Sequence, residues 1–451
     1  MMMAGKEKIF LISLGCSKNL VDSEHMLGLV RSCGLEPVSS IEDADIALVN
    51  TCAFIRDAVE EAVETILDLA SLKERGKLGK VVVAGCLVQR YGRKLTSEIP
   101  EVDAWLGTGD FHRVTEVLLD REEKPGRRIF ISRPTGLADH TMPRERATPF
   151  YTAYLRIAEG CSHRCSYCTI PALRGPFRSR SVESLIIEAE GMACEGVKEV
   201  NLVAQDTTQY GKDLEGDVGI EDLLERLIHV EGLRWIRLLY CHPERISDRL
   251  LDLIESHQSL CPYLDIPLQH VNHDILSRMG RAPTRESPLE LIERIRSRSR
   301  SISIRTTLMV GFPGETEDKF RELLDFIRVA RFDHLGVFVF SPEKGTRAAR
   351  LGPQVDPHEA AERLGEIMSV QAEISREAKR KMLGKVVQVL IEGFSDQSQL
   401  LLKGRTSTMA PDVDEQVLIN RGRGEMGEIV PVRITEAHPY DLVGEIVSRD
   451  H

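Results

Sequence analysis

The sequence predicts an α/β protein with three successive units: an N-terminal parallel α/β domain, a partial barrel of about six βα units, and a small antiparallel β-barrel. Apolar runs alternate with helical stretches over residues 8–120 and again over 151–380, which is typical of parallel sheets covered by helices. After residue 381 the helical stretches stop and short β-rich runs follow. We expect the units to span 1–122, 147–381 and 382–451, joined by a charged, proline-containing linker at 123–146 with one short strand at 128–132.

Three cysteines recur at matched places in the first unit. The predicted strands cover 8–14, 45–49 and 81–84, with helices at 19–33 and 57–75. Cys16, Cys52 and Cys86 each lie in the loop that follows one of these strands. Because the carboxyl ends of parallel strands meet at one edge of the sheet, we expect the three thiols to converge there as ligands of a cluster. The alternative is that they are ordinary buried cysteines at strand ends.

The second unit is predicted to carry its chemistry at the carboxyl ends of its strands. The predicted strands are 153–157, 199–203, 235–239, 263–266, 303–310 and 335–340. Loops with polar residues and glycines follow four of them, at 204–208, 267–270, 311–316 and 341–346. Glycine allows close approach of a ligand to the backbone, although it also serves simple turns. We therefore expect a shared pocket at these ends, and Arg305 on one strand is a candidate partner for a carboxylate.

A second set of cysteines lies directly after the first strand of this unit. Cys161, Cys165 and Cys168 fall within eight residues. Three thiolates hold one face of a 4Fe–4S cluster and leave one iron open for another ligand. A closed zinc site needs four protein ligands, and within this loop only His163 is available as a fourth. The pattern favours the cluster and leaves zinc as the alternative.

The third unit consists of five predicted short strands, which together indicate a small barrel. They lie at 386–391, 400–402, 415–419, 428–434 and 442–447.

Composition and charge restrict the partners. The chain has no apolar stretch of the ~20 residues that cross a membrane, and its start lacks the apolar core of a signal peptide, so we expect a cytoplasmic protein. The net charge is −11, with −6 on residues 1–120, −1 on 121–381 and −4 on 382–451. This charge disfavours binding to nucleic acid and suits a basic partner. Asp412, Asp414 and Glu415 are candidate steering charges.

The cysteine loop, with an aromatic residue just before its last cysteine, resembles the cluster motif of the radical S-adenosylmethionine (radical SAM) enzymes. The resemblance implies that the open iron chelates S-adenosylmethionine, that Tyr167 packs near its adenine, and that the loop containing Gly311, Gly314 and Glu315 contacts its adenosyl part. Gln205 and Arg305 are further candidate contacts.

The order of the three units is similar to that of the methylthiotransferases, whose last unit is a TRAM domain. The sequence words that carry the likeness are SLGCSKNLVDSE at 13–24, IPALRGPFRSR at 170–180, QDTT at 205–208 and YLDIPLQH at 263–270. They resemble the branch that modifies an aspartate of small-subunit ribosomal protein S-twelve.

This resemblance implies a specific reaction. One S-adenosylmethionine, bound at the Cys161/Cys165/Cys168 cluster, generates a radical that takes hydrogen from the aspartate β-carbon. A second one supplies the methyl group, and a second 4Fe–4S cluster on Cys16, Cys52 and Cys86 holds the sulfur. The resemblance also implies a reducing electron donor and a sulfur donor as partners, and it implies no association with a membrane.

Two alternatives stay open. The tRNA adenosine methylthiotransferases of the MiaB type share the cofactors, but the acidic last unit and the Gln205-Asp206 pair make tRNA a less suitable substrate. A non-catalytic iron–sulfur electron carrier is the other alternative, although a carrier gains nothing from open irons.

Overall fold

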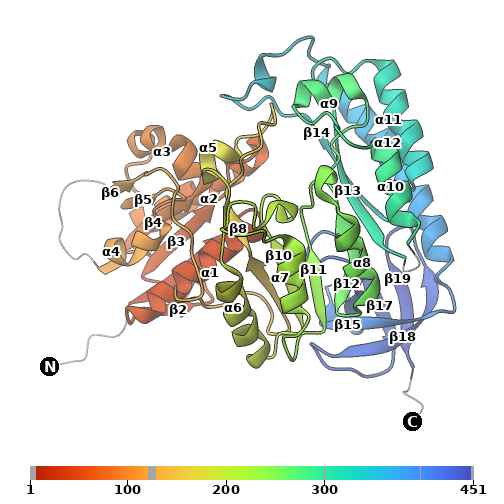
Figure 1. Cartoon of the computed structure of the whole chain (residues 1–451). Helices are drawn as coiled ribbons and strands as arrows, with labels where there is room; N and C mark the ends of the chain where they lie inside the picture. The colour runs from red at the N-terminus through yellow and green to blue at the C-terminus, as the bar shows by residue number, and fades with distance from the viewer. Residues whose placement is uncertain (1–6, 120–127, 299–300, 397, 448–451) are drawn as a thin grey trace.

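The computed structural model describes residues 7–119, 128–298, 301–396 and 398–447, and it contains the three predicted units (Figure 1). In Figure 1 the N-terminal unit lies at the left, the central unit in the middle and right, and the C-terminal barrel at the lower right. Helix α1 lies between the first two units and contacts strand β7 of the second.

The N-terminal unit is a parallel sheet of six strands in the order β2-β1-β3-β4-β5-β6. Its strands are β1 (Lys8–Ser13), β2 (Glu36–Val38), β3 (Ile46–Thr51), β4 (Lys80–Gly85), β5 (Ala104–Leu106) and β6 (Arg128–Phe130). Its helices are α1 (Ser17–Ser32), α2 (Arg56–Glu74), α3 (Cys86–Glu98) and α4 (Val114–Leu119). The predicted strands correspond to β1, β3 and β4. Strands β2 and β5 escaped prediction because three residues are too few to show an apolar pattern, whereas β6 corresponds to the strand expected at 128–132.

The central unit is an open sheet of six parallel strands in the order β7-β10-β11-β12-β13-β14, which confirms the predicted partial barrel. Its strands are β7 (Thr152–Arg156), β10 (Glu199–Val203), β11 (Trp235–Leu238), β12 (Leu260–Asp265), β13 (Ser303–Val310) and β14 (His334–Val339), with a short pair β8 (Ala158–Glu159) and β9 (Arg178–Ser179). Its helices are α5 (Ile170–Arg174), α6 (Val182–Cys194), α7 (Ile220–Leu227), α8 (Asp248–Ser256), α9 (His273–Met279), α10 (Pro288–Arg296), α11 (Glu317–Ala330) and α12 (Pro357–Arg380).

Local sequence explains where these helices start and which face they bury. Helix α10 begins with a capping box, in which Ser287 and Glu290 satisfy each other's backbone N–H groups, and Pro288 occupies the first turn. Helix α8 buries Leu250 and Ile254, four residues apart on one face, in the central core.

The C-terminal unit is a closed barrel of five strands in the order β15-β16-β17-β19-β18. The strands are β15 (Val386–Ser395), β16 (Ser398–Thr406), β17 (Val417–Arg421), β18 (Ile429–Ala437) and β19 (Leu442–Ile446). We predicted a wholly antiparallel barrel, but β17 and β19 pair in parallel. Strand β18 lies between β15 and β19 rather than beside β17, so β19 returns in the direction of β17 and closes the barrel.

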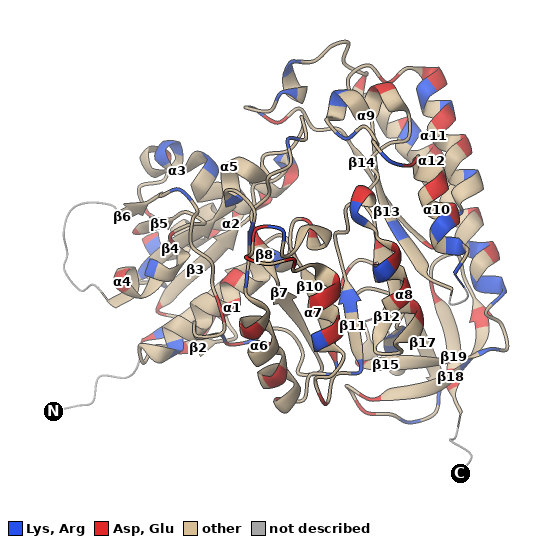
Figure 2. Ribbon diagram, viewed as in Figure 1, with Lys and Arg blue, Asp and Glu red and all other residues tan. Residues whose placement is uncertain are grey.

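Surface charges of the central unit are largely paired. Acidic and basic residues alternate along α11 and α12 (Figure 2). Glu317 pairs with Arg321 at 2.7 Å, and Arg331 pairs with Glu377 at 2.5 Å. Among the described helices, none is both long and apolar enough to span a membrane.

A buried carboxylate joins the C-terminal barrel to the central one. Glu199 on β10 is fully buried and accepts hydrogen bonds from Arg237 at 2.9 Å and from Arg405 of β16 at 2.7 Å. Burial alone would raise the pKa of Glu199, but the two guanidinium groups lower it to about 2. The carboxylate is therefore ionised, and the share of its compensation that comes from Arg405 is present only while the two units are docked.

A second contact between these units surrounds His334 of β14. His334 Nδ1 lies 2.6 Å from Glu415 Oε2, and Nε2 lies 2.9 Å from the Thr408 carbonyl. Tyr263 donates to Asp414 at 2.7 Å. The prediction that Asp414 and Glu415 are steering charges is therefore wrong, because both carboxylates turn inward onto the central unit. Asp412 is exposed, although it accepts a hydrogen bond from Tyr154 at 2.8 Å.

Removing Arg405 should loosen the C-terminal barrel. In Arg405→Met, Glu199 stays buried with only one of its two guanidinium partners. Breaking a buried ion pair costs about 3 kcal/mol. We expect a fall of that size in the free energy of urea unfolding, with faster proteolysis between α12 and β15. Arg421→Met is the matched control, since the Arg421 side chain is 83% exposed. Equal stability of the two variants would contradict the docking role of Glu199.

The His334 contact should weaken at alkaline pH. Burial would lower the pKa of His334, but Asp414 and Glu415 raise it above its ordinary value. A raised folded-state pKa stabilises the fold fully below the unfolded value of about 6.5, and this stability is lost as pH rises through the folded value. We expect the difference in thermal midpoint between the wild type and His334→Gln to shrink between about pH 6 and pH 9. A difference that stays constant or grows would show that His334 is not an imidazolium here.

Candidate active site between two cysteine sets

The loop that carries Cys161, Cys165 and Cys168 connects β8 to α5 and is fixed by backbone hydrogen bonds at both ends. The Cys161 amide donates to the Gly175 carbonyl at 3.0 Å, and the Ser166 amide donates to the Met279 carbonyl of α9 at 2.8 Å. The loop therefore lies over the carboxyl-terminal end of the central sheet, where the sequence predicted the chemistry.

The three thiols of this loop influence one another. Burial raises the pKa of Cys161 to about 11 and that of Cys168 to about 12, and the neighbouring Cys165 acts in the same direction on both. Thiols with such values are deprotonated only when a metal replaces the proton. Two donors already face the sulfurs: the Ile170 amide lies 3.4 Å from Cys168 Sγ, and Arg281 Nη1 lies 3.8 Å from Cys165 Sγ. The loop is thus suited to hold anionic thiolates.

His163 is poorly placed to act as a fourth ligand. Its Nε2 lies 2.7 Å from Asp206 Oδ2, and its ring stacks on His242 with centroids 4.6 Å apart. Burial alone would raise the pKa of Asp206, but hydrogen bonds from His163 and Thr208 lower it. The Nδ1 atom of His163 is left, but among the described residues no group of three ligand atoms within 4.8 Å of one another includes His163, which disfavours the zinc alternative.

The cysteines of the N-terminal unit converge as predicted. Cys16 precedes α1, Cys52 follows β3, and Cys86 opens α3. A Cβ on Gly15, whose φ is +93°, would lie 2.7 Å from the Cys52 Cβ, so only glycine lets these loops meet. Burial raises the pKa of Cys86 to about 12, and both Cys16 and Cys52 are near enough to raise it further.

The distances between the cysteine sulfurs distinguish a site for an iron–sulfur cluster from a site for a single metal ion. A zinc ion with Zn–S bonds of about 2.3 Å would hold its sulfurs about 4 Å apart. In the part of the chain that the structure describes, only His334, Asp414 and Glu415 bring three ligand atoms within 4.8 Å of one another. Neither cysteine triplet is that compact, as expected for thiols spread over the face of a cluster. The His334 group is already occupied by the docking contacts above.

Helix α5 connects the two cysteine sets. It begins two residues after Cys168, and its last residue, Arg174, donates to Asp22 at 2.5 Å and to Asn19 at 2.9 Å, both on α1. Arg174 acts on the pKa of Cys86 against the effect of burial, and this interaction places its guanidinium beside the second set. The two sets thus face one interface between the first and second units.

Tyr167 and the 311–315 loop lie together beside the cluster loop. Tyr167 packs against the apolar cluster that contains Phe312 and Phe340, and burial raises its pKa. Within the loop, Glu315 accepts from the Gly311 amide at 3.1 Å and from Arg363 of α12 at 2.6 Å. A Cβ on Gly311 would meet Ala360 of the same helix at 2.6 Å. Gly311 and Glu315 therefore fix this loop to α12.

The remaining candidate contacts to S-adenosylmethionine lie at different places in the structure. Gln205 donates to Glu159 at 3.1 Å next to the cluster loop. A Cβ on Gly314 would meet Arg278 of α9 at 2.5 Å. Arg305 lies deeper, 3.6 Å from Asp414 of the C-terminal unit. The structure does not bring Arg305 to the cluster loop.

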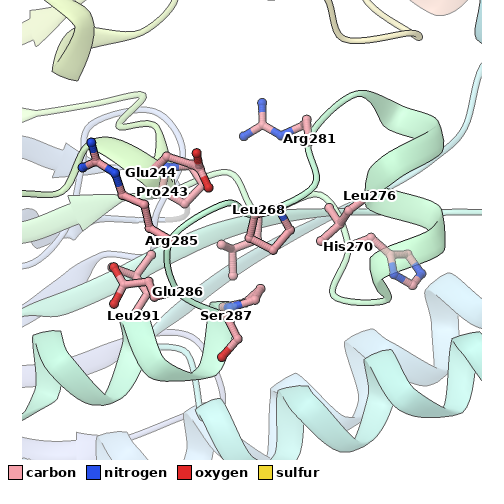
Figure 3. A pocket seen from close by; sticks show the side chains of 12 residues that line it. Pro243, Glu244, Leu268, His270, Leu276, Arg281, Arg285, Glu286, Ser287 and Leu291 are labelled. Carbon is pink, nitrogen blue, oxygen red and sulfur yellow. The ribbon is translucent and has the colours of Figure 1, made fainter.

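A pocket lies beside the cluster loop, between the loops that follow β11 and β12 (Figure 3). Glu244, Leu268, Arg281 and Arg285 are among the residues that line it. Arg281 also donates to the Pro267 carbonyl at 2.8 Å, which orients it toward Cys165. No spacing in the sequence singled out Arg281, because it reaches the cysteine loop only through the turn after α9.

Comparison with known proteins agrees with this arrangement. Three family models match: Uncharacterized protein family UPF0004 over residues 8–107, the Radical SAM superfamily over 155–327 and the TRAM domain over 383–447. The ribosomal protein uS12 methylthiotransferase RimO of Geobacter sulfurreducens is 47% identical, and that of Pelobacter propionicus is 46% identical; each match covers 98% of this chain and 99% of the relative. The chain belongs to the RimO family.

A solved structure supports the fold independently. The radical S-adenosylmethionine methyltransferase TsrM from Kitasatospora setae, with tryptophan and a SAM analog bound, superposes with a TM-score of 0.58 at 14% identity, covering 82% of this chain and 89% of that chain. Membership of the RimO family makes the chain a radical SAM methylthiotransferase, so it is an enzyme rather than an electron carrier, and the tRNA-modifying alternative is not favoured.

Arg281 should tune the cluster of the central unit. A guanidinium beside Cys165 favours the more negative, reduced cluster, so Arg281→Leu should lower the reduction potential. We expect the reduction potential to fall by on the order of 60 mV in an EPR-monitored redox titration. For one electron this is about a tenfold change in the equilibrium constant for reduction. Arg285→Leu, at the same pocket but without a contact to the cysteines among the described residues, is the control. An unchanged potential in Arg281→Leu would remove Arg281 from the electrostatics of the site.

Proposed function

We propose that this enzyme adds a methylthio group to the β-carbon of an aspartate in ribosomal protein uS12, using two 4Fe–4S clusters held by its two cysteine sets. The observation that supports the proposal is the position of helix α5, which begins two residues after Cys168 and ends at Arg174, a neighbour of Cys86 that also binds Asp22 of α1. The relatives at 46–47% identity, whose names specify uS12, support the substrate.

Each cysteine set has its own task. Cys161, Cys165 and Cys168 hold the cluster that binds S-adenosylmethionine, with Tyr167, Gln205 and the 311–315 loop as candidate contacts to the adenosyl part. Cys16, Cys52 and Cys86 hold the second cluster, which carries the sulfur. When bound, these cofactors supply hydrogen abstraction, sulfur and a methyl group, none of which ordinary side chains provide.

The chain itself contributes orientation and exclusion of water. Arg281 and the Ile170 amide face the sulfurs of the first set, and Arg174 faces the second. At the α1–β7 contact the first two units pack through buried apolar side chains, which keeps water out of that part of the interface. A closed site keeps a reactive radical away from solvent. An external one-electron reductant and a sulfur donor complete the reaction, and both are partners of this site.

The cluster assignment has a direct test. The anaerobically reconstituted wild type should bind about eight irons, as two 4Fe–4S clusters require. Alanine at Cys161, Cys165 and Cys168 should halve the iron and abolish formation of 5′-deoxyadenosine. Alanine at Cys16, Cys52 and Cys86 should halve the iron and retain part of that activity, and alanine at Cys33 and Cys194, outside both sets, should change neither. Full iron in both triple variants would refute the assignment.

The substrate is tested separately. Purified uS12 and an unmodified tRNA are offered in separate reactions, and each is measured by mass spectrometry for one added methylthio group. We expect modification of uS12 alone. Modification of the tRNA alone would overturn the substrate and leave the cluster assignment intact.

A further inference from the structure

Lys18 is a buried lysine that forms no direct ion pair among the described residues, although Asp265 is near enough to interact with it electrostatically. Its side chain is 8% exposed, and among the described residues no carboxylate forms an ion pair with it. Its Nζ instead lies 3.3 Å from the centre of the Tyr240 ring. The nearby acids are used elsewhere: Asp22 pairs with Arg156 and Arg174, and Asp265 accepts a hydrogen bond from the Tyr240 amide at 3.1 Å.

The position of Lys18 relates it to both cysteine sets. It lies in the first turn of α1, two residues after Cys16, and its ammonium crosses the interface to the carboxyl-terminal end of β11 in the central unit. Four residues further along the same helix, Asp22 binds Arg174, the residue that closes α5 after the other cysteine loop. Lys18 is therefore in the interface between the two sets.

The ring that meets Lys18 is held in an unusual backbone conformation. Tyr240 has a φ of +60°, a left-handed conformation that residues other than glycine adopt only at a cost in backbone strain. The Thr207 amide donates to the Tyr240 carbonyl at 3.1 Å, and together with Asp265 it fixes this conformation. Strain of this kind persists where surrounding contacts impose it, and it concentrates at ligand sites. Here it turns an aromatic face toward the ammonium.

The ammonium of Lys18 contacts an aromatic face directly and Asp265 only at longer range, so its charge is incompletely compensated. Burying a charge without a direct counterion is costly, and a cation–π contact offsets only part of that cost. The dipole of α1 adds positive potential at the same end of the helix. The combination of a buried ammonium and a helix N-terminus favours an anion, and a carboxylate matches both the charge and the hydrogen-bonding capacity of the ammonium.

We propose that Lys18, held by Tyr240, binds the side-chain carboxylate of the substrate aspartate between the two cysteine sets. The inference rests on the proposed function and extends it by naming the group that recognises the substrate. The carboxylate is bonded to the carbon that receives the sulfur, so anchoring it fixes that carbon relative to both clusters. A neutral group at the same place, such as an asparagine amide or a nucleobase, would leave the ammonium without a directly bound counterion. Lys18 would therefore distinguish a substrate carboxylate from neutral groups as well as add binding affinity.

The test compares binding of two forms of uS12, one with the target aspartate and one with asparagine at that position. Dissociation constants are measured with the anaerobically reconstituted wild type and with Lys18→Met, Lys18→Gln and Lys18→Arg. Lys94→Met is the matched control, because Lys94 lies in the same unit with its side chain 75% exposed. Binding gives a value for every pair, whether or not turnover is detectable.

We expect the wild type, Lys94→Met and Lys18→Arg to bind the aspartate form at least tenfold more tightly than the asparagine form. Lys18→Met and Lys18→Gln should bind both forms equally, with normal iron content and at least a hundredfold slower methylthiolation. A preference for aspartate that survives in Lys18→Met and Lys18→Gln, or a wild type without preference, would overturn the proposal. Loss of iron in both variants would assign Lys18 to the Cys16 cluster instead. A wild type that binds the aspartate form selectively but never methylthiolates it would refute the proposed function and not this site.

Discussion

The structure depends on carboxylates of one unit that are buried against arginines of another. Asp22 of the N-terminal unit binds Arg156 and Arg174 of the central unit, and Glu199 of the central unit binds Arg405 of the C-terminal barrel. Such pairs add little net stability, because burying each charge costs nearly what the pair returns. Their effect is on geometry, since a shift of either unit would leave a charge buried and uncompensated. The units are thereby fixed at the separation that the chemistry requires.

Most of the fold was predictable because its signals are local. The strands at 199–203 and 303–310 have the predicted bounds, since each is a run of β-forming residues between clear turns. The convergence of Cys16, Cys52 and Cys86 was also predictable, because parallel topology alone brings strand ends together. The three-residue strands β2 and β5 were not, and the parallel β17–β19 pair was not, because it depends on which strand closes the barrel.

Contacts between units escaped prediction for a different reason. Asp414 and Glu415 have the sequence character of surface acids, and only the docked arrangement shows that they bind Tyr263 and His334. Lys18 lay within a motif that identified the family, but nothing in the motif distinguishes a buried lysine from an exposed one. Arg281 lies more than a hundred residues from the cysteine that it contacts. In each case the contacted residue lies on another helix, strand or loop, so the spacing of residues within one element cannot predict the contact.

Helix α5 has a consequence for how separable these units are. The helix belongs in sequence to the central unit, yet Leu173 packs into the core of the N-terminal unit and its carbonyl accepts a hydrogen bond from Thr108 at 2.5 Å. A gene fragment that ends at the apparent domain boundary would therefore encode an N-terminal unit with a hole in its core and an unneutralised Asp22. Exchange of this unit between relatives would require the recipient to match α5 as well as the sheet, so the first two units form one structural assembly rather than interchangeable modules.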